Sequence, residues 1–234
     1  KMATMGEMIG SIAHQWKQPL SLISTSNGML RLNLEFDSFP KKDLEESCEN
    51  IDKSVQNLSH TIDDFRNFFN PNKKREYFKV YSALEKTFQL IKSQFKNNNI
   101  ELIQSVDKDV EIYAVENELL QALINLFKNS KDEFERKTEL EDKILKISVY
   151  NKAGNAVIEV LDSAGGIPED IISNIFEPYF TTKESKGGSG IGLYMCKQII
   201  ENMNGKISVE NKEFTHNNKI HKGAQFKLEI PNTY

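Results

Sequence analysis

Two glycine clusters lie on either side of a mixed polar and aromatic segment in the C-terminal half. The first follows the apolar run AVIEVL and its Asp162, and the second, at residues 187–192, opens a run with helical apolar spacing. Free backbone N–H groups and the positive end of a helix suit an anion such as phosphate. The Asp162 carboxylate accepts hydrogen bonds, and a purine's exocyclic amine donates them. Either cluster alone could be an ordinary turn, but together they predict a nucleotide site.

The same region resembles the GHKL ATP-binding fold, specifically the catalytic domain of sensor histidine kinases. Residues 162–167 are similar to the family's DxGxGI box, residues 176–183 to its F box and residues 188–193 to its second glycine box. Ala164 stands at the first glycine of DxGxG, where a positive φ would cost an alanine about 1–2 kcal/mol. The resemblance implies an ATP site formed by Asn125, Asn129, Asp162, Gly166, Ile167, Phe180, Thr182, Lys183, Gly188, Gly190, Ile191, Gly192 and Leu193.

A further pattern lies in ENELLQALINLFKNSKD, residues 116–132, where apolar residues form a predicted buried helix face. Asn125 and Asn129, four apart, share another face, which by itself could be capping or solvated. The spacing resembles the family's N box, which implies that Asn129 coordinates Mg²⁺ with Asn125 nearby. Gyrase-type ATPases of the superfamily have a water-activating glutamate where this chain has Asn125. The resemblance therefore implies slow ATP hydrolysis and a γ-phosphoryl group kept for a protein nucleophile.

His14 is the candidate for that nucleophile. It lies two residues from both Ile12 and Trp16 of an apolar stripe that predicts a helix over residues 5–34, so it should face solvent. An exposed histidine is often incidental, but HQWKQPL resembles the family's H box, in which a proline follows the phospho-accepting histidine by five residues. Pro19 occupies that position. The resemblance implies phosphorylation of His14.

Two glutamines depart from the H box. Gln15 replaces an acidic residue that many members have, and a glutamine cannot act as a general base, so activation is milder or comes from elsewhere. Gln18 stands where the family usually has Thr or Asn to position a water for phosphatase activity, and it shares a helix face with His14. Alternatively, both glutamines belong to a solvated helix face.

A second helix is expected after a loop at residues 37–42. Its apolar residues alternate by four and three, as in heptads, at Leu44, Cys48, Ile51, Val55, Leu58, Ile62, Phe65 and Phe69. Two such helices would form an antiparallel hairpin with too little core to stand alone. A homodimer with a four-helix bundle is the expected result.

Turn formers and basic residues at 70–75 predict the domain boundary. Residues 1–70 would be the dimerisation and histidine phosphotransfer hairpin, and residues 71–234 a catalytic ATP-binding domain, an α/β sandwich with a mixed sheet. Its expected elements, besides the N-box helix, are strands near 76–80, 100–106, 111–115, 143–150, 156–161, 206–211 and 224–230 and helices at 82–96 and 168–175. His216 and His221 are expected in the loop between the last two strands.

Composition restricts the alternatives. The 234 residues have a net charge of −4 and a pI near 5.7, which gives no support for nucleic acid or a membrane surface as the main partner. No run of about 18 apolar residues occurs. A start at Lys1 suggests a fragment of a longer protein whose sensor or membrane part is missing. Cys48 and Cys196 are expected to be reduced core thiols of a cytoplasmic protein.

These features predict ATP- and Mg²⁺-dependent autophosphorylation on His14 and transfer of the phosphoryl group to an aspartate of a response regulator, with phosphatase activity involving Gln18. One alternative is a GHKL ATPase that drives a conformational change, against which Asn125 argues. Another is a degenerate kinase that serves as a dimeric nucleotide-binding scaffold, which Gln15 and Ala164 keep open.

Overall fold

The computed structural model describes residues 2–36, 40–68, 74–137, 139–182 and 190–232; within its helices, the side chains of residues 2–18, 57 and 60–68 lie outside the description. The chain forms two compact units. One contains Lys1–Asn72, and the other contains Lys73–Thr182 and Gly190–Tyr234. The exact domain boundary after residue 70 stays a prediction.

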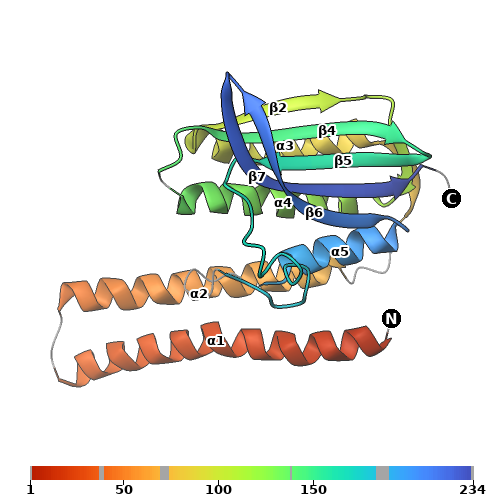
Figure 1. The fold of residues 1–234 in the computed structure, drawn as a ribbon. Helices are drawn as coiled ribbons and strands as arrows, with labels where there is room; N and C mark the ends of the chain where they lie inside the picture. Colours follow the sequence, from red (N-terminus) through yellow and green to blue (C-terminus); the bar gives the residue numbers. More distant parts are fainter. Residues whose placement is uncertain (1, 37–39, 69–73, 138, 183–189, 233–234) are drawn as a thin grey trace. The chain divides into compact units, whose positions relative to one another are not determined.

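The first unit is a hairpin of two helices, α1 (Met2–Glu35) and α2 (Lys41–Phe68), drawn in red and orange in Figure 1. Helix α1 continues through Pro19. The hairpin was expected, but the heptad positions at its seam differ from the prediction. Small side chains, Ser26 of α1 and Ser47 and Ser54 of α2, are the buried residues at the described part of the seam. Half-buried Ile51 and Leu58 also belong to the α2 seam. From Ser47 onward the seam residues are therefore spaced by four, three and four.

Within the single chain, Cys48 is not a core thiol of the hairpin, which corrects the prediction for this unit taken alone. Its side chain is exposed, one position beside the seam residue Ser47. Leu20 and Leu34, predicted on the core stripe of α1, are likewise exposed in the single chain. Ile23 and Leu30, also on the predicted stripe, are half-buried at the seam, and Ser26 between them is buried. The shift leaves much of the apolar surface of the hairpin outside its own core.

The second unit contains a mixed five-stranded sheet with the strand order β2-β4-β5-β7-β6. The strands are β2 (Ile100–Val106), β4 (Lys143–Lys152), β5 (Asn155–Asp162), β6 (Lys206–His216) and β7 (Lys219–Pro231). Only β2 and β4 pair in parallel; the other neighbours are antiparallel. A separate two-stranded sheet pairs β1 (Glu76–Lys79) with β3 (Glu111–Ala114). The predicted mixed sheet is confirmed.

Three helices cover one face of this sheet: α3 (Val80–Asn97), α4 (Glu116–Arg136) and α5 (Gly192–Asn202) (Figure 1). Alternate strand residues point toward them, among them Ile147, Ile158 and Leu228, all fully buried with Leu123 and Phe127 of α4. The strands thus bury one face against the helices, as α/β layer packing requires. This core positions the carboxyl end of β5 next to α4.

Two sequence-based expectations fail in the second unit. Residues 168–175 form a series of turns, with Ile172 N–H donating to the Pro168 carbonyl but no continuous helical ladder. The last two strands are longer than predicted, and they meet at a two-residue turn in which Asn217 and Asn218 have φ of 49° and 59°. Two successive positive φ values characterise a type I′ hairpin turn. His216 and His221 therefore lie in β6 and β7 rather than in a loop.

Within the described residues, no helix combines the length and the apolar character that a membrane span needs.

Candidate nucleotide-binding site

The side chain of Asp162 lies at the end of β5 and is only 4% exposed. Its Oδ1 accepts hydrogen bonds from the backbone N–H groups of Ala164 (2.9 Å) and Ala224 (3.1 Å). Its Oδ2 accepts a longer one, 3.4 Å, from the hydroxyl of Ser130 on α4. Because a carboxylate oxygen can accept more than one hydrogen bond, Oδ2 can still receive a donor from a ligand such as a purine amine.

Burial raises the pKa of Asp162, with the nearby Glu133 carboxylate acting in the same direction. The donors Ala164, Ala224 and Ser130 oppose this effect because they stabilise the ionised form. The ionised carboxylate is the form that can accept from an amine at both oxygens. Because burial disfavours the charged form, ionisation of Asp162 weakens the folded state when no ligand is bound.

An Asp162→Asn variant should reveal this cost as a pH-dependent gain in stability. The folded-state pKa is raised above the ordinary value of 3.8, so folded Asp162 keeps its proton where the unfolded chain has lost it. Wild-type stability contributed by this proton is present at low pH and is lost as pH rises through the folded-state pKa. Asparagine does not titrate, so the nucleotide-free variant should melt above wild type near neutral pH, by about 2–4 °C per kcal/mol. Thermal unfolding of both proteins between about pH 4 and pH 7 measures the difference, which should grow with pH.

The same substitution at the exposed Asp170 is the matched control and should leave the melting temperature unchanged at each pH. If Asp162→Asn has the same melting temperature as wild type at every pH measured, the buried charge carries no net cost in stability.

The loop after β5 is attached to β7 and to the end of α4. Gly165 N–H donates to the Lys222 carbonyl of β7 at 2.7 Å, and the Lys137 ammonium at the end of α4 donates to the Ala164 carbonyl. Gly165 and Gly166 have φ of 86° and 83°, the left-handed region that favours glycine. Ala164 has no positive φ, so the strain that a left-handed alanine would introduce does not arise, and the residue is buried.

Gly223 of β7 lies directly against the end of β5. A Cβ atom on Gly223 would collide with the Asp162 carbonyl oxygen and would lie 2.9 Å from Oδ1. The contact leaves β7 close enough for its Ala224 N–H to reach the carboxylate. A side chain at position 223 would push the two strands apart.

We expect Gly223→Ala to destabilise the second unit by about 3 kcal/mol, near the upper end for overpacked sites. Gly192→Ala is the matched control, because a Cβ there meets no atom within 4 Å, and it should change stability by no more than about 1 kcal/mol. Chemical denaturation of both variants measures the effect. Equal denaturation midpoints for the two variants would mean that β7 moves away from β5 without a cost in stability.

The two N-box asparagines are both half-buried on α4. Asn125 Nδ2 donates to the carbonyl of Gly192, the first residue of α5, at 3.4 Å. The side chain of Asn129 forms no hydrogen bond with another described residue, so its oxygen is available to a ligand. The described residues contain no group of three or more His, Cys, Asp or Glu suited to a metal ion. A single asparagine oxygen fits Mg²⁺ only if water and phosphate complete the coordination.

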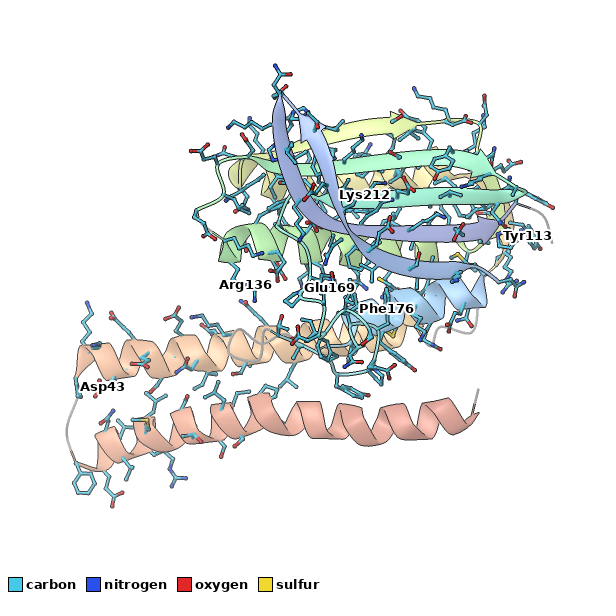
Figure 2. The ribbon with its side chains drawn as sticks, viewed as in Figure 1. Asp43, Tyr113, Arg136, Glu169, Phe176 and Lys212 are labelled. Atoms are coloured by element: carbon cyan, nitrogen blue, oxygen red, sulfur yellow. The ribbon has the colours of Figure 1, made fainter. Side chains whose placement is uncertain are left out.

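The F box contacts the second glycine box directly. Tyr179 N–H donates to the Gly190 carbonyl at 3.0 Å, and a Cβ on Gly190 would lie 2.5 Å from the Tyr179 carbonyl oxygen. Gly190 has φ of 64°, so glycine suits it on two grounds. Phe176, labelled in Figure 2, packs edge-to-face on Phe226 of β7 with ring centroids 6.3 Å apart. This arrangement brings the F box to the start of α5.

The remaining predicted residues are distributed as follows. Ile167, Phe180 and Leu193 are half-buried against the core, Thr182 is exposed, and Ile191 immediately precedes α5. Cys196 is a buried core thiol, as predicted, and burial raises its pKa to about 12. Lys183 and Gly188 lie outside the described residues. For His14 and Gln18 only the helical backbone of α1 is described.

A cavity of about 400 Å³ borders the same loop at Ser163 and Gly165. Its lining includes three carboxylates, Glu139, Glu141 and Asp142, two of which pair with Lys219. Carboxylates repel phosphate, so this cavity does not suit the triphosphate. The start of α5 suits it better, because the N-terminus of a helix directs backbone N–H groups and a positive dipole end outward.

Four residues at the site were missed by the sequence argument: Ser130, Lys137, Asn211 and Gly223. Ser130 directly follows Asn129, and its burial at i+4 from Leu126 was a readable signal. The other three lie far in the sequence from the β5 loop that they contact, and no local pattern marks them.

A buried carboxylate after a central strand, a glycine loop beside it and a helix that starts at a second glycine cluster define a nucleotide-binding class of domain. Residues 114–234 match the family described as histidine kinase-, DNA gyrase B-, and HSP90-like ATPase. The chain therefore belongs to this family, and its relatives are sensor histidine kinases, as the resemblance predicted.

The chain is 30% identical to the sensor protein KdpD of Clostridium acetobutylicum over 96% of its length and spans 24% of that protein. It is 27% identical to the sensor protein FixL of Bradyrhizobium diazoefficiens over 99% of its length and spans 44% of it. Of solved structures, the nucleotide-free catalytic domain of histidine kinase ThkA has 29% identity and a TM-score of 0.56, covering 68% of this chain and 98% of that domain. The ThkA complex with response regulator TrrA shares the fold over 99% of this chain and 63% of that one, with a TM-score of 0.67 and 23% identity.

Proposed function

We propose that this chain is the kinase part of a sensor histidine kinase that binds ATP in its second unit and phosphorylates His14. The observation that carries the proposal is the buried Asp162 carboxylate, fixed by two backbone donors on one oxygen and open to a further donor on the other. An exocyclic amine of adenine supplies that donor. Family membership and the relatives' names support the kinase assignment.

The phosphates would lie at the start of α5, between the half-buried Asn125 and Asn129 of α4 and the backbone of residues 190–192. Asn125 holds the Gly192 carbonyl, which orients the first turn of α5. The helix N-terminus contributes N–H groups and a positive dipole end toward the phosphate oxygens. Asn129 would contribute one oxygen to a Mg²⁺ ion that neutralises phosphate charge when bound.

Phosphoryl transfer then needs only a nucleophile and its position. A neutral imidazole nitrogen of His14 forms a bond to the γ-phosphorus, and the bond to the bridging oxygen breaks, so ADP leaves with the electron pair. An unperturbed histidine is largely neutral near pH 7. Asn125 at the position of a catalytic glutamate disfavours attack by water, since an amide cannot accept the proton.

The acceptor of the second transfer is an aspartate of a response regulator. Its carboxylate oxygen would bond to phosphorus while the nitrogen–phosphorus bond breaks, which returns neutral His14. ThkA, which shares this fold, was crystallised with a response regulator protein. Gln18, four residues after His14, can hydrogen-bond a water that hydrolyses the aspartyl phosphate of the regulator, and this phosphatase role is part of the proposal.

Incubation of the chain with γ-labelled ATP and Mg²⁺, followed by mapping of the label, tests the function. Acid-labile, alkali-stable label on His14 supports the kinase. Release of inorganic phosphate without protein label would favour a GHKL ATPase. ATP binding with neither outcome would favour a nucleotide-binding scaffold.

We also propose that the hairpin forms a homodimer. Several apolar side chains on it are 46% to 53% exposed in the single chain: Leu20, Leu22, Met29, Leu32 and Val55. Burying them against a second copy removes apolar area from water and completes a four-helix bundle.

Leu32→Glu should weaken self-association at least tenfold, because it would bury an unpaired charge at that surface, about 1.4 kcal/mol or more. Exposed Glu46→Gln is the matched control. Sedimentation equilibrium measures the dissociation constants. A wild-type chain that stays monomeric at all concentrations would contradict the homodimer.

A further inference from the structure

Asn211 of β6 makes an unusual pair of contacts with the loop that follows β5. Its Oδ1 accepts the backbone N–H of Ile167 at 2.7 Å, and its Nδ2 donates to the Ile167 carbonyl, also at 2.7 Å. Nδ2 also donates to Glu169 Oε1 at 3.0 Å. The carboxamide thus satisfies both backbone groups of one residue, as a neighbouring strand would do.

Gly166 has the complementary shape. A Cβ atom on Gly166 would collide with Asn211 Oδ1 and lie 2.9 Å from its Cγ. The backbone at Gly166, with φ of 83°, passes directly over the carboxamide. Glycine at this position therefore serves the approach of Asn211 as well as the turn itself.

The same part of β6 also borders the base-recognising carboxylate. Asn211 pairs with Ala224 in the sheet, and the Ala224 N–H donates to Asp162 Oδ1. One pair of residues on β6 and β7 therefore fixes both Asp162 and Ile167, which lie on either side of the glycine turn. The two contacts set the distance between the base acceptor and the loop residue that follows it.

We infer that Asn211 is a positioning residue for the nucleotide: it holds Gly166 and Ile167 in the conformation that receives the purine beside Asp162. This inference rests on the proposed ATP site. Asn211 acts through the Ile167 backbone and does not touch the reacting atoms. Neither the motif pattern nor the family resemblance assigned it a role.

ATP affinity of the whole chain, measured by titration calorimetry, tests the inference. Asn211→Ala should bind ATP about tenfold more weakly than wild type, equivalent to about 1.4 kcal/mol. Asn211→Asp should be weaker than Asn211→Ala, because its second oxygen would face the Ile167 carbonyl and the Glu169 carboxylate. Lys212→Ala is the matched control. It removes the exposed neighbouring side chain on β6, labelled with Glu169 in Figure 2, and should bind ATP as wild type does.

Rescue separates positioning from general stability. Adding Glu169→Gln to Asn211→Asp replaces the facing carboxylate by an amide donor, so the double variant should regain ATP affinity over Asn211→Asp alone. The melting temperatures of the same proteins without nucleotide show whether a variant has lost stability.

If wild type binds ATP and the affinity of Asn211→Ala lies within twofold of it, the inference is overturned and the proposed function stays intact. Loss of affinity without rescue, matched by a parallel loss of nucleotide-free stability, would also overturn it as a merely structural effect. Wild type that does not bind ATP would overturn the proposed function and this inference with it.

Discussion

A His14→Gln variant is expected to incorporate no acid-labile phosphate from γ-labelled ATP, against clear labelling of wild type. Glutamine is similar in length and polar, but its amide nitrogen is not nucleophilic, so the phosphorus–nitrogen bond cannot form. The loss should be complete rather than partial, because no other residue of the H box can take over the step. Label retained on the protein and the site identified by mass spectrometry are the measurements.

ATP affinity provides the control for that result. His14 lies in the helical hairpin, whereas the proposed base and phosphate contacts all come from the second unit, so the variant should bind ATP as tightly as wild type. Gln15→Ala is a matched change at the adjacent position and should retain labelling if that residue belongs to a solvated face. Undiminished labelling of His14→Gln would remove the residue as the acceptor.

Asp162→Asn should weaken ATP binding about 100-fold and shift the preference toward inosine triphosphate. The backbone donors Ala164 and Ala224 both require an acceptor at the Oδ1 position, so the new amide nitrogen must take the Oδ2 position. There it presents a donor to the donor amine of adenine, and each buried group left without a partner costs about 1–3 kcal/mol. Hypoxanthine carries an acceptor oxygen where adenine has the amine, so it can pair with the amide.

The ratio of the two nucleotide affinities is the decisive measurement, because a folding defect would lower both together. We expect the ratio of inosine triphosphate to ATP affinity to rise at least about tenfold over wild type, equivalent to about 1.4 kcal/mol. Asp170→Asn, an exposed carboxylate in the following turn, should leave the ratio unchanged. An unchanged ratio in Asp162→Asn would mean that the carboxylate does not contact the base.

The parts of the site that sequence could predict are those marked by residue type at short spacing. Asp162 and the two glycines that come shortly after it predict a tight turn at the end of a strand. In the structure both glycines have a positive φ. Asn125 and Asn129 share a helix face by periodicity alone. The mixed sheet, which the family resemblance implied, is confirmed, whereas the helix expected at residues 168–175 is not.

The missed residues depend on which strands become neighbours. Asn211 reaches Ile167, and Gly223 reaches Asp162, only because β6 and β7 pair beside β5 in a particular register. Alternation along a strand tells which face a residue takes but not what lies opposite it. A polar residue in a half-exposed strand such as β6 carries no local sign of its partner.

The Cys48 error has a different cause. Apolar residues at spacings of four and three fit two adjacent heptad frames, and the periodicity alone could not choose between them. The structure selects the frame in which Ser47 and Ser54 take the seam. A heptad prediction based on apolar residues alone does not place small polar residues such as these serines at the seam.

Those serines have a consequence for how the helical unit responds to dilution. In the part of the hairpin whose side chains the structure describes, the buried residues Ser26, Ser47 and Ser54 contribute little apolar area, so contacts within one chain supply only part of the free energy that keeps this part folded. Association with a second copy would supply the rest, and the melting of the hairpin would then follow mass action. At nanomolar concentrations the helices would unwind while the sheet domain, with its own core, remained intact, so cellular abundance would help to set how much competent phospho-acceptor exists.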